Sequence, residues 1–176
     1  MALCTIRGVF EVRAATVGDA EAIAETVQLG FDSFRAWAGP DFDPPPAAVE
    51  LERTREGLAR PSTWAVIALS DGEPAGHVSL TQARERAEPR ADIPGLAHLW
   101  QLFVRPPWWG SGLATRLHAL VVAEAAARGY AAIRLHTPSG HRRARAFYER
   151  EGWRTDGVLL PEPLLGIDLM EYRRDL

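Results

Sequence analysis

The sequence contains no lysine, no asparagine and only one cysteine, Cys4, among its 176 residues. A P-loop needs a lysine for its phosphates, and Schiff-base chemistry needs a lysine amine, so both are excluded. A single cysteine cannot form a disulfide within the chain, which is typical of proteins in a reducing compartment. We therefore expect a cytoplasmic protein whose chemistry does not use lysine.

Features of other protein classes are also missing. All 20 basic residues are arginine and the net charge is −3, so nothing indicates nucleic acid as a partner. No apolar run is long enough to span a membrane, and residues 1–9 lack the order of a signal peptide. The five histidines show no metal-ligand spacing, so we expect no metal site. The length predicts a single domain over residues 1–176.

The rest of the chain is organised around residues 99–128. Residues 96–104 are apolar and aromatic, as expected of a buried strand, and Pro106-Pro107 ends it because proline lacks a backbone N–H. Gly110-Ser111-Gly112 follows, and a helix is then expected. Its apolar face is predicted at Leu113, Leu117, Leu120 and Val121.

The turn between this strand and this helix is a candidate anion site. The first amides of a helix have no internal partner, and the helix dipole favours negative charge there. Gly110 and Gly112 carry no Cβ, so a phosphate can approach the backbone. The turn therefore predicts a phosphate or pyrophosphate ligand; the alternative is a tight strand-to-helix turn that binds nothing.

Periodicity and turn signals predict the remaining elements. Helices are expected over 20–37, 47–60 and 141–151, and strands over 10–14, 63–69, 74–81, 131–136, 153–158 and 166–172. Gly76 is expected at a bulge or a close contact. Residues 83–94 mix charge with proline and are expected to form a loop. The apolar segment 159–165 is expected to connect the last two strands as a ligand lid or a subunit contact, which favours a homodimer.

Aromatic and acidic residues alternate between positions 31 and 43. Two interpretations remain open. In the first, the aromatic residues pack in the core and the acids lie on a solvated loop. In the second, the segment is a substrate wall whose acids attract a cationic amine. The residues are Phe31, Asp32, Phe34, Trp37, Asp41, Phe42 and Asp43.

Two segments together resemble the GCN5-related N-acetyltransferase (GNAT) family. Residues 102–114 match the family's strand, proline and Arg/Gln-x-x-Gly-x-Gly/Ala loop, and residues 141–153 match its Asn-x-x-Ala-x-x-Phe-Tyr-x-x-x-Gly-Phe pattern. They occur in the family's order, separated by one expected helix and one expected strand. Two positions depart from the pattern: Trp109 replaces Arg or Gln, and His141 replaces Asn.

The resemblance implies a single-domain α/β (α+β) fold, with a mixed, mostly antiparallel central sheet flanked by helices. It also implies that acetyl-CoA donates an acetyl group to the amine of a small molecule or peptide, by direct attack in a ternary complex. The pyrophosphate would bind the amides of 110–115, the pantetheine arm would pair with 102–104, and an amide there would stabilise the oxyanion. The implied cofactor-binding residues are Leu102, Phe103, Val104, Trp109, Gly110, Ser111, Gly112, Leu113, Ala114, Thr115, His141 and Ala144.

Two catalytic residues follow from the same resemblance. Tyr148 would be the general acid, since a phenol with a pKa of roughly 10 is protonated at neutral pH; otherwise it is a core tyrosine. His98 stands where many members have a glutamate base, and His77 and Glu85 are rivals for this role. Strand alternation is expected to place His98 and Trp100 on one face of the sheet, with Leu99 and Gln101 on the other.

A second function also remains open: a non-catalytic acyl-CoA-binding sensor or regulatory module would need the donor site but no acid. Two further classes fit less well. A dinucleotide oxidoreductase needs a small residue where this chain has Thr115. A serine hydrolase needs a glycine at the position of Trp109.

Overall fold

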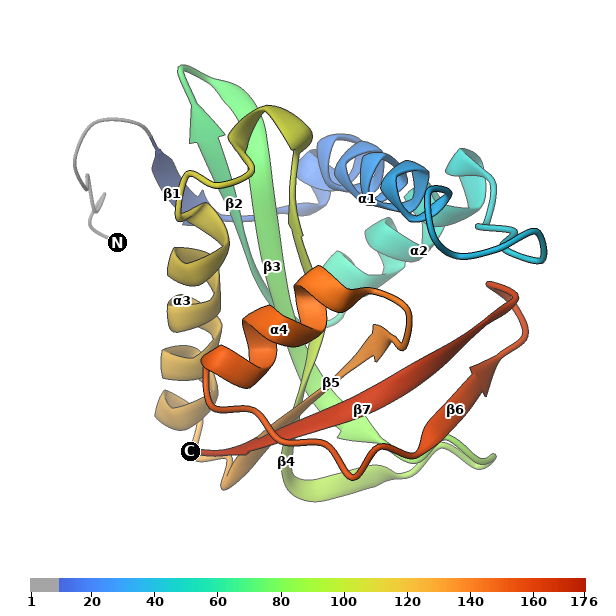
Figure 1. The fold of residues 1–176 in the computed structure, drawn as a ribbon. Coiled ribbons are helices and arrows are strands. Elements are labelled where there is room, and N and C mark those ends of the chain that lie inside the picture. The colour runs from blue at the N-terminus through green and yellow to red at the C-terminus, as the bar shows by residue number, and fades with distance from the viewer. Residues whose placement is uncertain (1–9) are drawn as a thin grey trace.

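The computed structural model describes residues 10–176, which form a seven-stranded sheet flanked by helices (Figure 1). Cys4 and residues 1–9 lie outside this part. The strands are β1 (Glu11–Ala14), β2 (Trp64–Ser70), β3 (Glu73–Arg84), β4 (Asp92–Val104), β5 (Ala132–Pro138), β6 (Leu159–Glu162) and β7 (Ile167–Asp175). The helices are α1 (Ala20–Phe34), α2 (Ala47–Ala59), α3 (Leu113–Ala127) and α4 (Arg142–Arg150), with 3₁₀ turns at Val17–Asp19 and Pro106–Trp108.

The strand order is β1-β2-β3-β4-β5-β7-β6, and only β4 and β5 pair in parallel. The predicted mixed, mostly antiparallel sheet is therefore confirmed. None of the helices between residues 10 and 176 is long and apolar enough to cross a membrane.

The helices cover both faces of this sheet (Figure 1). On one face α3 packs on β3 and β4, and its buried residues Leu113, Leu117 and Val121 join the main core. Leu120, predicted on the same face, is exposed, because the buried stripe follows i, i+4 spacing down the helix. On the other face α1 and α2 pack together, and α1 contributes Phe31 and Phe34 to a second aromatic core.

Three predicted segments differ from the structure. The loop predicted over residues 83–94 is present but shorter, at residues 85–91, because β3 runs on to Arg84 and β4 begins at Asp92. The proline at 94 is tolerated since it lies where the β3–β4 register shifts, so no ladder hydrogen bond is lost. The Gln82 side-chain amide holds this end of the hairpin by donating to the carbonyls of Ile93 (2.6 Å) and Leu96 (3.0 Å).

Residues 153–158 do not form the predicted strand and pair with β7 only through one bridge, at Arg154. The Thr155 hydroxyl accepts from the Gly157 N–H and the Asp156 carboxylate from the Val158 N–H, so local turns replace the ladder. The apolar segment 159–165 is not merely a connection, because it begins with edge strand β6. Its Leu164 is 80% exposed, and the homodimer stays a prediction.

A bulge in β4 shapes the centre of the molecule. Gln101 pairs with Ser79 while Leu99 pairs with Leu80, so Trp100 is an extra residue. The predicted alternation is therefore wrong here: Gln101 does not share a face with Leu99 but donates its side-chain N–H to Glu50 of α2.

Three glycines make room around the bulge. A Cβ on Gly57 of α2 would meet the Trp100 ring at 2.2 Å, and one on Gly30 of α1 would meet the Phe103 ring at 2.3 Å. A Cβ on Gly76 would lie 2.7 Å from the Phe103 carbonyl oxygen, which confirms the close contact expected there. Glycine is unfavourable inside a helix, so the two helical glycines indicate that the bulged strand needs this closeness.

β4 and β5 separate directly beyond the bulge. They pair only where Leu96–His98 of β4 meets Ala132–Arg134 of β5. A bulged strand bends, so the remainder of β4 diverges from its neighbour. The sheet consequently opens into a V-shaped gap between residues 99–104 and residues 135–138.

Candidate active site

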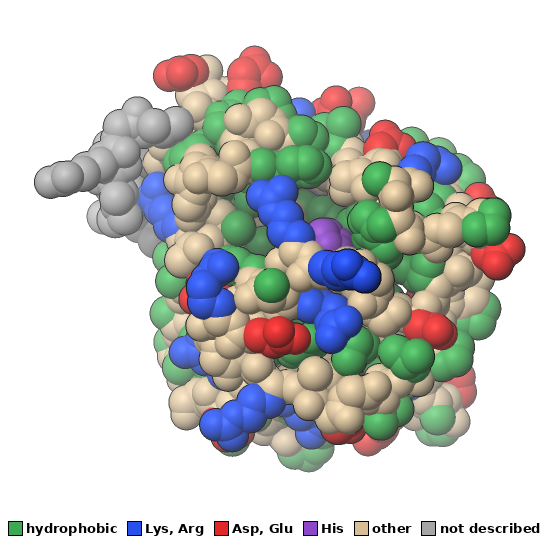
Figure 2. Space-filling view, in the orientation of Figure 1, with side chains coloured by type: hydrophobic (Ala, Val, Ile, Leu, Met, Phe, Trp, Pro, Cys, Tyr) green, Lys and Arg blue, Asp and Glu red, His purple; other side chains and the backbone are tan. Residues whose placement is uncertain are grey.

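A cavity of about 1830 Å³ occupies this gap and extends to both sides of the sheet. Pockets for a single drug-sized ligand measure roughly 300–1,000 Å³, so this one has room for two molecules. In the space-filling view the hollow is edged by arginine side chains, and a histidine is visible inside it (Figure 2). Its walls come from α1, α2, β3, β4, β5, the start of α3, α4 and the β6–β7 turn.

The glycine turn forms one end of the cavity. Gly110 and Gly112 both have φ of +83°, which only glycine adopts without strain. The Ser111 N–H donates to the Trp108 carbonyl, and the Leu113 N–H to the Ser111 hydroxyl, each over 3.3 Å. Of the predicted anion-binding amides, these two therefore already have partners.

The other four predicted amides are free of partners within residues 10–176. They belong to Gly110, Gly112, Ala114 and Thr115, and they surround the first turn of a 15-residue helix. Such amides, together with the helix dipole, are the usual components of an anion site.

Trp109, the residue that departs from the family pattern, ties this turn to β4. Its indole Nε1 donates to the Val104 carbonyl over 2.7 Å, and the ring is 44% exposed. The guanidinium of Arg143, from α4, lies 5.0 Å from the centre of the ring. A positive charge thus reaches the turn although Trp109 carries none.

The predicted strand residues lie along the gap. Leu102 and Val104 pack towards the core beneath α3, whereas Phe103 packs on Phe31 and stacks with His77. Along residues 99–104, β4 pairs with β3 only. Apart from the Val104 carbonyl, which accepts from Trp109, its backbone groups on the β5 side are therefore available to an extended ligand arm.

Tyr148 lies on the opposite wall, in α4. It is 7% exposed and packs against Trp153 and Tyr172, with ring centres 5.7 and 6.3 Å away. Burial raises the pKa of its phenol, so the hydroxyl stays protonated at neutral pH. Tyr148 lines the cavity, and its hydroxyl has no hydrogen-bond partner within the described part of the chain.

His141 caps α4, as asparagine would. Its Nδ1 accepts from the Ala144 N–H over 3.3 Å, and its ring packs on Phe34 and Trp37. Burial lowers the pKa of His141, which keeps the ring neutral and Nδ1 an acceptor. Ala144 lies next to it on the cavity wall.

The predicted base His98 and its rival His77 are both held neutral. Burial, followed by repulsion from His136 and Arg134, lowers the pKa of His98 to about 3, and its Nδ1 is buried without a partner. Burial lowers the pKa of His77 to about 4, and its Nε2 donates to Gln101. The other rival, Glu85, lies on the cavity wall after β3.

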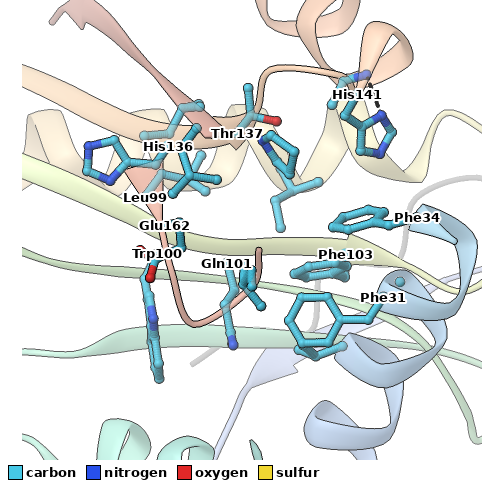
Figure 3. Close-up of a pocket in the computed structure, with 18 of the residues that line it drawn as sticks. Phe31, Phe34, Leu99, Trp100, Gln101, Phe103, His136, Thr137, His141 and Glu162 are labelled. Carbon is cyan, nitrogen blue, oxygen red and sulfur yellow. Dashed lines mark hydrogen bonds between the residues drawn. The ribbon is translucent and has the colours of Figure 1, made fainter. Parts of the chain in front are cut away.

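His136, which the sequence pattern did not single out, also lines the cavity (Figure 3). Its Nε2 lies 3.2 Å from a carboxylate oxygen of Glu171 on the neighbouring β7. The sequence holds one sign of this placement. His136 ends the strand predicted over 131–136, and this strand, β5, pairs in parallel with β4, which leads into the glycine turn.

The aromatic stretch contributes both to a core cluster and to the cavity wall, and the attraction of a cationic amine by its acids stays a prediction. Phe31, Phe34 and Phe42 pack edge to face or tilted against one another as a core cluster. Phe31 and Phe34, with Trp37, also form one wall of the cavity (Figure 3). Residues 10–176 contain no cluster of three or more His, Cys, Asp or Glu side chains that could hold a metal.

Comparison with known proteins places this geometry in a family. Residues 31–153, more than half of the chain, match the model of the acetyltransferase (GNAT) family. The chain belongs to the GNAT acetyltransferase family. A search of curated proteins gave no match.

Solved structures agree in fold. An acetyltransferase of the GNAT family from Desulfovibrio desulfuricans is 25% identical, with a TM-score of 0.71 over 94% of this chain and 98% of its own. A ribosomal-protein-alanine N-acetyltransferase from Brucella melitensis is 17% identical, with a TM-score of 0.71; the match covers 94% of this chain and 99% of that protein. The PaiA N-acetyltransferase from Thermoplasma acidophilum, solved with coenzyme A, is 14% identical, with a TM-score of 0.64; the match covers 93% of this chain and 98% of that protein.

Proposed function

We propose that this GNAT protein is an acetyl-CoA-dependent N-acetyltransferase that acts on a small-molecule or peptide amine in a ternary complex. One observation carries the proposal: the gap between β4 and β5 leads from four free amides at the start of α3 to the Tyr148 hydroxyl. The neighbour solved with coenzyme A supports the choice of donor. The cytoplasmic location and the class of acceptor, a small-molecule or peptide amine, remain predictions.

In this proposal the residues of the glycine turn and strand bind the donor. The free amides of 110–115 would hold the pyrophosphate, with Arg143 adding a positive charge beside Trp109. The pantetheine arm would run along residues 102–104, where β4 has no partner on its β5 side. His141 and Ala144 would border the arm from α4.

The chemical step needs two proton transfers. The amine loses a proton to a base, its nitrogen attacks the thioester carbon, and the C–S bond breaks. Tyr148, protonated at neutral pH, would give its proton to the departing thiolate. His98 is the base expected from the sequence, and its pKa of about 3 makes it a weak one.

The first experiment is thermal unfolding with and without acetyl-CoA, with NAD as the control ligand. A ligand at a hundredfold its dissociation constant adds about 2.7 kcal/mol, which is roughly 5–10 °C for a chain of this size. A shift with acetyl-CoA alone supports the donor site, and no shift would contradict it. Thiol release with an amine panel then separates an enzyme from a sensor, since a sensor would shift without releasing thiol.

A further inference from the structure

We propose that His136, oriented by Glu171, is the general base that deprotonates the acceptor amine. This inference rests on the proposed function and deepens it. It depends on where His136 lies, on which of its nitrogens is occupied, and on the charges that surround it.

His136 lies close to the point where the gap opens. The last pair between β4 and β5 joins His98 to Arg134, and His136 follows two residues further along β5. Leu135 and Tyr148 belong to the core on the α3 side of the sheet. Because side chains alternate along a strand, His136 points to the other face, which α1 and α2 cover. The donor arm and the amine would therefore meet between Tyr148 and His136.

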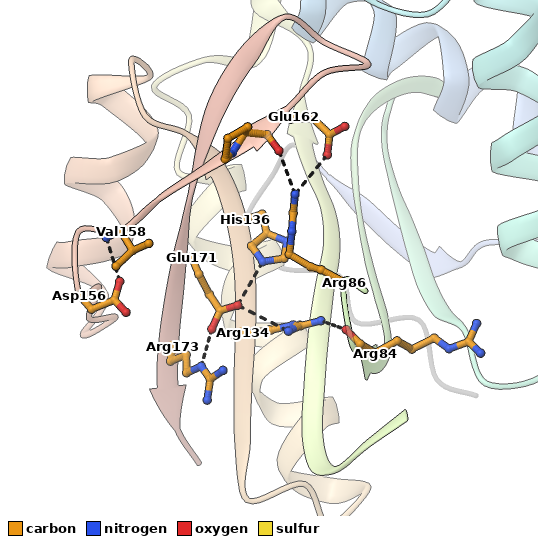
Figure 4. Close-up of polar contacts among 10 residues, drawn as sticks. Arg84, Arg86, Arg134, His136, Asp156, Val158, Glu162, Glu171 and Arg173 are labelled. Atoms are coloured by element: carbon orange, nitrogen blue, oxygen red, sulfur yellow. Dashed lines mark hydrogen bonds and ion pairs between the residues drawn. The ribbon is translucent and has the colours of Figure 1, made fainter. Parts of the chain in front are cut away.

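Glu171 determines which nitrogen of His136 can accept a proton. The hydrogen bond from His136, together with Arg173 and Arg134, lowers the pKa of the Glu171 carboxyl to about 2. An ionised carboxylate can only accept, so His136 Nε2 carries the hydrogen in their 3.2 Å contact (Figure 4). Nδ1 then holds the lone pair, and no residue between 10 and 176 hydrogen-bonds to it. A carboxylate that orients a histidine in this way is a recurrent arrangement for a general base.

The surrounding charges are mixed. Arg134 shares the Glu171 carboxylate at 3.5 Å, and Arg173 also binds it. On the cavity side Arg86 donates to the Pro161 carbonyl and lies 4.0 Å from Glu162 (Figure 4). The ring of His98 is centred 5.3 Å from that of His136. Glu171 is thus the direct anionic partner of a protonated His136, while His98 stays neutral beside it.

The proton balance closes with this assignment. An ammonium acceptor gives one proton to His136 Nδ1, and the free amine attacks the thioester carbon to form the C–N bond. The C–S bond breaks and Tyr148 protonates the thiolate. The tyrosinate then takes the second amine proton, and His136 releases its own to solvent. Acetylated amine, free coenzyme A thiol and one proton are the products.

The test uses the full chain and measures thiol release from acetyl-CoA. The acceptors are a peptide with a free N-terminus, a polyamine and a free amino acid. His136→Gln should lower kcat at pH 7 by roughly 10²- to 10⁴-fold, the usual contribution of a general base. Its acetyl-CoA thermal shift should match that of the wild type. Part of the rate should return at high pH, where the amine deprotonates without help.

Glu171→Gln tests the positioning role. Without the carboxylate a protonated His136 loses its anionic partner, so the acid limb of the pH–rate profile should move to lower pH. A purely structural role would lower the rate but leave this limb in place. Glu56→Gln, on the exposed surface of α2, is the matched control and should leave the profile unchanged.

Two results would overturn the assignment while leaving the proposed function intact. One is a wild-type rate in the His136→Gln variant, and the other is a greater loss of rate in His98→Gln than in His136→Gln. If the wild-type protein binds acetyl-CoA but releases no thiol with any of the amines, both the base and the enzyme function are overturned.

Discussion

The indole of Trp109 hydrogen-bonds to the carbonyl of Val104 and at the same time lies beneath the guanidinium of Arg143. Three elements therefore meet at one side chain: the end of β4, the glycine turn and α4. The family pattern has an arginine or glutamine in place of Trp109. In this chain Trp109 ties the glycine turn to β4 through its hydrogen bond, and Arg143 of α4 brings the positive charge.

Arg143→Ala should weaken acetyl-CoA binding without slowing the chemical step. An exposed charge pair contributes up to about 1 kcal/mol, so KM for acetyl-CoA should rise about fivefold while kcat stays unchanged. The effect should shrink at high salt. Steady-state kinetics at two salt concentrations measure both. Arg55→Ala, on the exposed side of α2, is the control. An unchanged KM would mean that Arg143 does not face the donor.

Tyr148→Phe should separate catalysis from binding. The variant keeps the ring packed against Trp153 and Tyr172 but removes the only proton that it can donate. We expect kcat to fall by roughly 10²-fold or more, the usual effect of losing a general acid, with the acetyl-CoA thermal shift preserved. Tyr130→Phe, in the connection between α3 and β5, controls for the loss of a hydroxyl. A full rate in Tyr148→Phe would remove this residue from the mechanism.

The parts of the site that the sequence predicted are those encoded by local pattern. The glycine turn needs positive φ at Gly110 and Gly112, and α4 needs a cap at His141, so neighbouring residues suffice to recognise both. The family resemblance added the roles of these residues, which their spacing alone does not supply.

The parts that the sequence did not predict depend on contacts between distant segments. Nothing near Trp100 distinguishes a bulged strand from a regular one, because the extra residue is defined only by the pairing with Ser79 and Leu80. His136 likewise gains its candidate role from Glu171, 35 residues away. Sequence reasoning assigned a base by position in the family, whereas the hydrogen-bond partner is visible only in the fold.

The buried carboxylate of Glu50 should lower the free energy of unfolding at neutral pH. It is 1% exposed, and burial raises the pKa of its carboxyl despite contacts with Arg53, Thr54 and Gln101. A raised pKa in the folded state means that ionisation opposes folding above that pKa. Glu50→Gln mimics the protonated form, so it should be more stable than the wild type at pH 7. The difference should vanish as the pH falls. Urea denaturation between pH 4 and 8 measures it, and a less stable variant at pH 7 would contradict the prediction.

The buried histidines should make the protein sensitive to mild acid. The pKa values of His77 and His98 fall to about 4 and about 3 in the folded state, against about 6.5 when unfolded. The unfolded chain therefore binds more protons below pH 6.5, so stability is full above that pH and declines as the pH falls towards 4. Protonation of the buried Glu50 carboxylate stabilises the folded state as the pH falls, so it opposes this decline over part of the range. His77→Gln keeps a polar partner for Gln101 and should flatten the decline, as measured by denaturation at each pH. An equally steep decline in that variant would assign the acid sensitivity to other groups.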